Sequence, residues 1–149
     1  MTIRAPFRSR QRVYFDDLDA LQLLHNVRFV LFMERARGEM FHALGFRWND
    51  APEDNPDRWH VVAEHQVRYL VPFRGEGEVE VEIRPTHLGR SSLVLAARVR
   101  DLHGETVYAD GTTRLVRIDP QSWRPCSWSP RFRAAMAPLL PQSPPSSGG

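Results

Sequence analysis

One short stretch of the chain concentrates side chains that could do chemistry: Asp16, Asp17, Asp19, His25 and Asn26. A carboxylate is ionised at neutral pH and can act as a general base or as a nucleophile. If a helix begins near Asn26, its first backbone N–H groups could stabilise an oxyanion. A structural role also fits, because carboxylates near a helix N-terminus cap free N–H groups and complement the helix dipole.

The residues after this cluster predict the helix that would position it. Between Val27 and Leu44 the apolar side chains recur at spacings of three and four, which is typical of a helix with a broad buried face. Asn26 is the expected N-cap and Gly45 the expected C-cap. Such a helix would be about 27 Å long at about 1.5 Å per residue. The apolar positions are Phe29, Phe32, Met33, Ala36, Met40, Phe41 and Leu44.

Alternating patterns on both sides of this helix predict strands. Residues 7–15 alternate between Phe, Ser, Gln and Val on one face and mainly arginines on the other, which indicates a strand with a solvated face. After a polar loop at 46–59, four more strands are expected near 61–69, 79–83, 93–99 and 106–118, and short Gly-containing separators suggest an antiparallel meander. Residues 130–140 could form a short helix.

One antiparallel sheet wrapped around one long apolar helix is the economical way to bury both elements. We therefore expect an α+β fold of about five strands in a single domain over residues 1–140. The last residues, 141–149, have the composition of a disordered tail. The sheet would keep an exposed edge, which favours dimerisation by strand pairing.

Composition excludes several classes of protein. All 20 basic residues are arginine, and 18 acidic residues leave a formal net charge of only +2, which argues against a nucleic-acid partner. The single cysteine, Cys126, rules out an internal disulfide. No segment has the length of a signal peptide's apolar region or of a membrane span, so a cytoplasmic protein is expected.

The run VYFDDLDALQLLHNVRFVLFMERARGEMF resembles the opening motif of the hotdog-fold acyl-CoA thioesterases of the 4-hydroxybenzoyl-CoA thioesterase type, including the Tol-Pal-associated thioesterases. The matching elements are the aromatic Phe15, the pair Asp17 and Asp19, and the segment Glu34–Arg37. The resemblance continues through VRYLVPFRGEGEVEVE and LGRSSL and covers about residues 8–119. It implies a hotdog fold and a thioesterase activity.

The resemblance also implies roles for individual residues. Asp19 corresponds to the catalytic carboxylate, which either attacks the thioester carbonyl or activates a water, while Asp17 shapes the loop. The backbone N–H at Asn26 or Val27 would bind the oxyanion. His25 could assist as an acid or could serve only as a helix cap.

This chain departs from the family pattern in the same loop. Many relatives have glycine where this chain has Leu21 and Gln22, and a histidine where this chain has Asn26. A bulkier loop could narrow the acyl pocket or shift the carboxylate. Asp17, Asp19 and His25 could also ligate a metal, but no second histidine has a suitable spacing, so no metal is expected.

Two further groups are candidates for substrate binding. Arg90, Ser91 and Ser92 form a predicted turn at the place where relatives carry basic and hydroxyl residues near the coenzyme A phosphates, although a turn arginine is often simply solvated. His65 lies on the apolar face of a predicted strand. It is either a satisfied inward-facing histidine or a residue that points into a cleft shared with a neighbouring subunit.

These observations predict a hydrolase that cleaves an acyl-CoA, or an acyl group on a carrier protein, with water and without a cofactor, as a homodimer or homotetramer. A hotdog dehydratase or hydratase is one alternative, but the His-Phe-Pro type of motif is absent. A non-catalytic acyl-binding protein is another, and it predicts that Asp19 can be replaced without loss of function. A nucleic-acid binder is disfavoured by the even charge balance.

Overall fold

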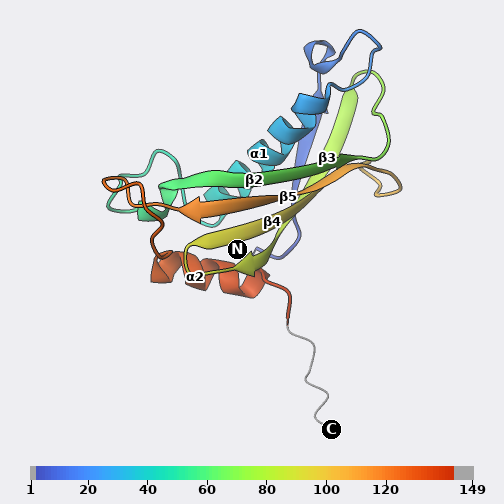
Figure 1. Ribbon diagram of the computed structural model, residues 1–149. Helices are drawn as coiled ribbons and strands as arrows, with labels where there is room; N and C mark the ends of the chain where they lie inside the picture. Colours follow the sequence, from blue (N-terminus) through green and yellow to red (C-terminus); the bar gives the residue numbers. More distant parts are fainter. Residues whose placement is uncertain (1–2, 143–149) are drawn as a thin grey trace.

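A computed structural model of the chain describes residues 3–142, which form a five-stranded antiparallel sheet packed against helices (Figure 1). The predicted tail from residue 143 onward lies outside the described residues. The strands follow the order β1-β3-β4-β5-β2, and every neighbouring pair is antiparallel. Their bounds are β1 Phe7–Val13, β2 His60–Tyr69, β3 Gly77–Leu88, β4 Ser92–Arg100 and β5 Val107–Arg117.

The predicted meander is correct only for β3, β4 and β5. Strand β2 does not pair with β3, as the short separator between them suggested, but with β5 at the far edge of the sheet. The segment 70–76 therefore crosses the end of the sheet instead of forming a hairpin turn. Gly111 on β5 permits this pairing, because a Cβ at this position would lie 2.3 Å from the Gln66 carbonyl oxygen of β2.

Helix α1 (Asn26–Ala43) is the predicted apolar helix, shifted by one residue at each end. The predicted N-cap, Asn26, is instead the first helical residue; His25 is the N-cap, and its Nδ1 accepts a 3.4 Å hydrogen bond from the Val27 N–H. At the other end Leu44 is the C-cap. Gly45 follows with a φ of +91°, a left-handed conformation that favours glycine.

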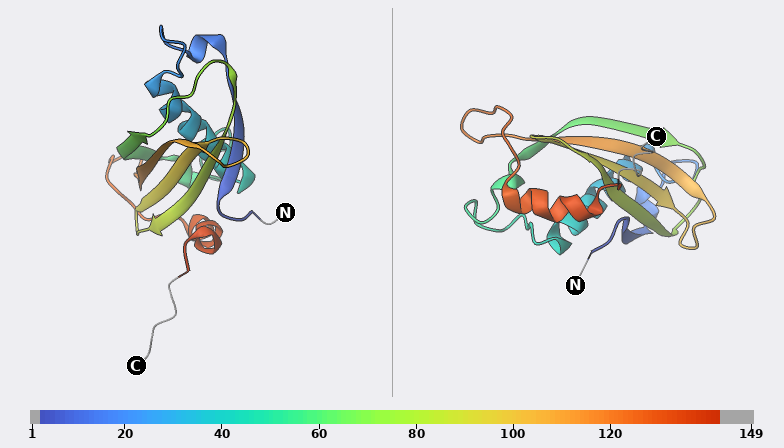
Figure 2. Two further views of the ribbon diagram at one scale, coloured as in Figure 1. Left: turned by 90° about the vertical axis from the view of Figure 1, so that its right-hand side faces the viewer. Right: turned by 90° about the horizontal axis from the view of Figure 1, so that it is seen from below.

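The buried face of α1 packs against one face of the sheet (Figures 1 and 2). Inward-facing side chains of the strands complete this core, for example Val81 on β3 and Leu95 on β4. The short helix α2 (Pro130–Met136) adds Phe132 and Met136 to it. No helix within residues 3–142 has both the length and the apolar character needed to cross a membrane.

The first strand ends earlier than the alternation predicts. β1 stops at Val13, and Phe15, expected on the inner face, is 77% exposed. The reason is a tight turn in which the Tyr14 N–H donates to the Asp17 carboxylate and the Asp17 N–H donates to the Tyr14 carbonyl. This turn redirects the chain into the loop that carries the acidic cluster.

Candidate active site

Asp17 holds the loop between β1 and α1 together. Its side chain is buried, accepts a 2.8 Å hydrogen bond from the Tyr14 N–H and lies 3.4 Å from Arg28 Nε. Its carbonyl accepts from the His25 N–H at 2.9 Å. A carboxylate with these partners is fixed in a structural position, so the geometry favours a supporting role for Asp17.

The carboxylate of Asp19 is held differently, because only one of its oxygens is engaged. Oδ1 accepts backbone hydrogen bonds from Leu21 at 2.8 Å and from Leu23 at 3.1 Å. Oδ2 makes no hydrogen bond with any residue in the described range 3–142. The side chain is thus oriented by the loop and keeps one oxygen available for a ligand.

The backbone of the same loop shows why glycine is favoured at the position of Gln22. Gln22 has a φ of +63°, in the left-handed region where glycine is favoured. For a residue with a Cβ this conformation costs roughly 1 kcal/mol. The Gln22 N–H donates to the Asp19 carbonyl at 3.0 Å, and the Gln22 carbonyl accepts from the Gly75 N–H at 2.9 Å, so both sides of the strained residue are tied down.

The segment 70–76, which crosses between β2 and β3, holds the loop of Asp19 in place. Besides the bond from Gly75 to Gln22, the Leu24 N–H donates to the Phe73 carbonyl at 2.9 Å, and Leu23 forms an antiparallel bridge with Arg74. Residues about 50 positions apart in the sequence therefore build one local structure. This arrangement places Asp19 beside the end of β2.

Asp19 opens onto a cavity of about 310 Å³ between the loop, the start of α1 and the end of β2. One side of the cavity is polar and includes Asp19, His25 and Asn26. The other side is mostly apolar, and its aromatic members Phe29 and Tyr69 pack edge to face with ring centroids 5.6 Å apart. The remaining lining residues are Leu23, Leu24, Leu70, Val71 and Pro72.

The N-terminus of α1 supplies hydrogen-bond donors to this cavity. The Asn26 backbone N–H has no acceptor within residues 3–142, whereas the next N–H, of Val27, is directed to His25. Tyr69 donates its hydroxyl to the Asn26 carbonyl at 3.0 Å and fixes this turn against β2. A free N–H at the positive end of a helix is suited to an anion or a developing oxyanion.

His65 lies elsewhere and does not line this cavity. It occupies the α1-facing side of β2, where Nε2 lies 3.1 Å from Glu34 Oε1 and Nδ1 lies 2.8 Å from the Thr113 hydroxyl. Arg37 forms two hydrogen bonds to the same glutamate, of 2.7 and 2.6 Å. Both ring nitrogens of His65 are thus satisfied, although 27% of its side chain remains exposed.

The structure does not bring Arg90, Ser91 and Ser92 to the Asp19 cavity of the same chain. They lie at the turn between β3 and β4, whereas the Asp19 loop contacts the start of β3, about 36 Å away along an extended strand of this length. Arg90 donates to the Ser127 hydroxyl at 3.0 Å. The Ser92 carbonyl accepts from the Trp128 indole, so the turn also packs against the C-terminal segment.

Sequence reasoning missed the apolar wall of the cavity. A signal was present for Tyr69, because it shares the period-two face of β2 with His65 and precedes Leu70 and Val71 in an apolar run. The sequence did not reveal that this run would turn at the sheet edge and lie opposite Asp19, since that depends on the pairing of β2 with β5.

Comparison with known proteins assigns the family. Residues 21–108 match the family model described as the thioesterase superfamily. A curated relative, the acyl-CoA thioester hydrolase YbgC of Escherichia coli, is 29% identical over 119 residues, which cover 80% of this chain and 87% of that protein.

Solved structures agree. A thioesterase from Thermus thermophilus complexed with coenzyme A and Zn is 32% identical with a TM-score of 0.73, covering 89% of this chain and 92% of that one. A putative thioesterase from Pseudomonas aeruginosa is 27% identical with a TM-score of 0.75, covering 87% and 96%. The five-stranded antiparallel sheet with its helices agrees with the hotdog fold of such thioesterases. The chain therefore belongs to the thioesterase superfamily and is a thioester hydrolase.

Proposed function

We propose that the protein hydrolyses an acyl-CoA thioester, with Asp19 as the catalytic carboxylate and the Asn26 backbone N–H as the oxyanion donor. The observation that carries this proposal is a single cavity whose lining includes Asp19, with one carboxylate oxygen free, the Asn26 N–H at the start of α1, and a mostly apolar opposite side. The apolar side suits the acyl group, and the polar side suits the thioester carbonyl. The similarity to an acyl-CoA thioester hydrolase supports coenzyme A as the thiol carrier.

In the general-base route, Asp19 Oδ2 takes a proton from a water whose oxygen attacks the thioester carbon. The carbonyl oxygen becomes an oxyanion that accepts from the Asn26 N–H. Collapse of the tetrahedral intermediate breaks the carbon–sulfur bond, and the thiolate receives the proton. In the nucleophilic route, Oδ2 attacks the carbon itself and expels the thiolate, and water then hydrolyses the resulting mixed anhydride.

His25 is placed to assist the leaving group. Its Nδ1 accepts from the Val27 N–H, so the neutral ring carries its proton on Nε2. From the cavity wall this N–H could donate to the departing sulfur. The same side chain caps α1, which means that replacing it would affect both helix stability and chemistry.

We further propose that two chains pair through β2 as a homodimer, which could associate further into a homotetramer. β2 is an edge strand, and Val61, Val62, Tyr69, Leu70 and Val71 expose apolar surface on and after it.

Antiparallel pairing about a two-fold axis would bring the start of the neighbouring chain's β2 to the Asp19 end of this one. The turn Arg90–Ser92 adjoins that start, because the Arg117 N–H donates to the Ser91 carbonyl and Arg117 pairs with His60. The neighbouring copy's turn could then contact the coenzyme A phosphates. His65 would approach a substrate only as part of this interface.

The single cysteine agrees with an enzyme of the cytoplasm.

A thiol-release assay over short, long and aromatic acyl-CoAs tests the activity. We expect steady-state release of free coenzyme A from at least one class, and matching acyl-carrier thioesters would show which thiol is preferred. No release from any thioester would refute the proposed function. Multiple turnovers in ¹⁸O-labelled water then test the nucleophilic route, because water that attacks the Asp19 side of the mixed anhydride leaves its oxygen in the Asp19 carboxylate, whereas the general-base route delivers label only to the released acid.

A further inference from the structure

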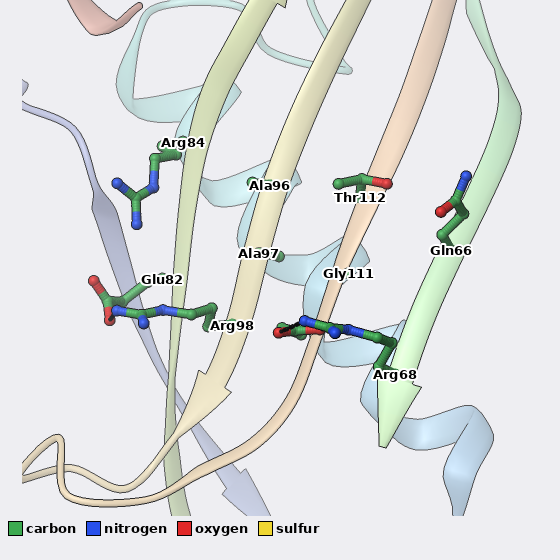
Figure 3. Close-up of a pocket in the computed structure, with 10 residues that line it drawn as sticks. Gln66, Arg68, Glu82, Arg84, Ala96, Ala97, Arg98, Gly111 and Thr112 are labelled. Carbon is green, nitrogen blue, oxygen red and sulfur yellow. Dashed lines mark hydrogen bonds and ion pairs between the residues drawn. The ribbon is translucent and has the colours of Figure 1, made fainter. Parts of the chain in front are cut away.

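A second cavity of about 300 Å³ lies on the outer face of the sheet, the face turned away from α1 (Figure 3). Two parallel cross-strand rows form it. One row runs through Glu82, Arg98, Asp110 and Arg68, and the adjacent row runs through Arg84, Ala96, Thr112 and Gln66. Neither row takes part in the proposed thioester chemistry.

The first row consists of ion pairs. Arg68 donates two hydrogen bonds to Asp110, of 2.9 and 2.8 Å. Glu82 is buried and accepts from Arg98 at 3.1 Å and from Arg100 at 2.6 Å. Burial alone would raise the pKa of Glu82, but these two guanidinium groups lower it below its ordinary value. Both carboxylates of the row are therefore neutralised by their neighbours.

The second row keeps its polar groups available. Arg84 forms no ion pair or hydrogen bond with another residue in 3–142, so its charge is not compensated. Ala96 beside it contributes only a methyl group, which leaves space above the sheet. Thr112 Oγ1 makes no hydrogen bond within the described range, and Gln66 uses only its NH₂ group, which donates to Glu64 at 2.6 Å. In Figure 3, Ala96 and Thr112 lie between Arg84 on one side of the cavity and Gln66 on the other.

The order of the groups along the second row indicates which kind of ligand would fit. An uncompensated guanidinium at one end suits a phosphate, because arginine forms paired, charge-assisted hydrogen bonds to it. The low floor at Ala96 leaves room for a sugar, and a hydroxyl with an amide oxygen at the other end suits a polar, hydrogen-bonding base. Three strand spacings separate Arg84 from Gln66, which is about 14 Å. We propose that this outer-face cavity, called the trough below, binds a nucleoside phosphate, with its phosphate at Arg84 and its base at Thr112 and Gln66.

Charge and position distinguish this site from other uses of the same surface. The acids of the first row interrupt the positive charge, so the trough suits one short anion better than a long polyanion. Its polar walls do not suit an acyl chain. Because it lies on the face of the sheet opposite α1, a ligand here would leave the Asp19 cavity open.

Titration calorimetry with ADP and with inorganic pyrophosphate tests the site without any turnover. We expect saturable ADP binding to the wild-type chain and a loss of about tenfold or more in Arg84→Gln, the size of a lost charge-assisted contact. Gln66→Ala should weaken ADP but not pyrophosphate. Arg10→Gln is the matched control, since it removes an exposed arginine of β1 outside the trough, and it should bind like wild type.

The source of the nucleotide follows from kinetics with Arg84→Gln. A raised KM for acyl-CoA with an unchanged KM for the acyl N-acetylcysteamine thioester would show that the trough, and not the Arg90 turn, holds the nucleotide of the substrate. Loss of ADP binding with both KM values unchanged would show a free nucleotide ligand. The proposal is wrong if wild type does not bind ADP, or if Arg84→Gln binds it like Arg10→Gln. It is also wrong if Ala96→Phe changes the oligomeric state and leaves ADP binding intact, since the trough would then be a contact between copies.

Discussion

Replacement of Asp19 by asparagine is the sharpest test of the active-site geometry. Asparagine keeps a side-chain oxygen that can accept the two N–H groups of Leu21 and Leu23, so the loop has no reason to rearrange. What changes is the second oxygen, which becomes an uncharged NH₂ group. The variant therefore removes the proposed nucleophile or base and leaves the surrounding hydrogen bonds in place.

The expected magnitude follows from the role of that oxygen. A positioned general base contributes about 100- to 10,000-fold to the rate, which corresponds to about 2.7 to 5.4 kcal/mol of transition-state stabilisation. We expect Asp19→Asn to lower kcat by at least about 100-fold. Both Asp19 hydrogen bonds remain, so the free energy of unfolding should change by less than about 1 kcal/mol.

Asp17→Asn is the matched control, because it makes the same chemical change two residues earlier. Asp17 is buried and paired with Arg28, so its replacement should lower the free energy of unfolding by about 1 to 3 kcal/mol. Its folded fraction should keep most of the activity. Thiol release and urea unfolding measured on both variants separate the two roles. An Asp19→Asn enzyme with the wild-type rate, or an Asp17→Asn enzyme that loses activity more severely while remaining folded, would refute the assignment.

Three further predictions follow from other contacts. Tyr69→Phe removes the 3.0 Å bond to the Asn26 carbonyl and should cost about 1 kcal/mol in urea unfolding, with kcat within about tenfold of wild type; a loss beyond a hundredfold would mean that the phenol takes part in the chemistry. Burial lowers the pKa of His60 below its ordinary value of 6.5, and the neighbouring charge of Arg37 adds to this, while the hydrogen bond to the Asp57 carbonyl opposes it. The unfolded chain binds this proton more readily than the folded state, so the free energy of unfolding falls as the pH falls from 6.5 to the folded pKa, by up to about 1.4 kcal/mol per pH unit. His60→Gln should lack this part of the pH dependence when unfolding is measured at several pH values. Val62→Lys places a charge on the exposed edge strand and should shift the protein to monomers in sedimentation, so an unchanged assembly would contradict pairing through β2.

Periodicity was sufficient to predict which segments become helices and strands. The three- and four-residue spacing of apolar side chains gave α1 to within one residue at each end, and alternation gave all five strands. Their ends were less predictable, because caps depend on individual hydrogen bonds. His25 rather than Asn26 caps α1, and the turn at Tyr14 ends β1 before Phe15.

The sequence alone identified the acidic cluster, the apolar helix behind it and a family resemblance that the comparisons confirm. It did not predict that β2 pairs with β5 rather than with β3. Strand order depends on contacts between residues far apart in the chain, and a local pattern carries no information about them. That pairing sends residues 70–76 across the end of the sheet, where they fix the loop of Asp19 and supply the apolar wall opposite it. The candidate carboxylate was thus named from the sequence, whereas the cavity around it was decided by the tertiary structure.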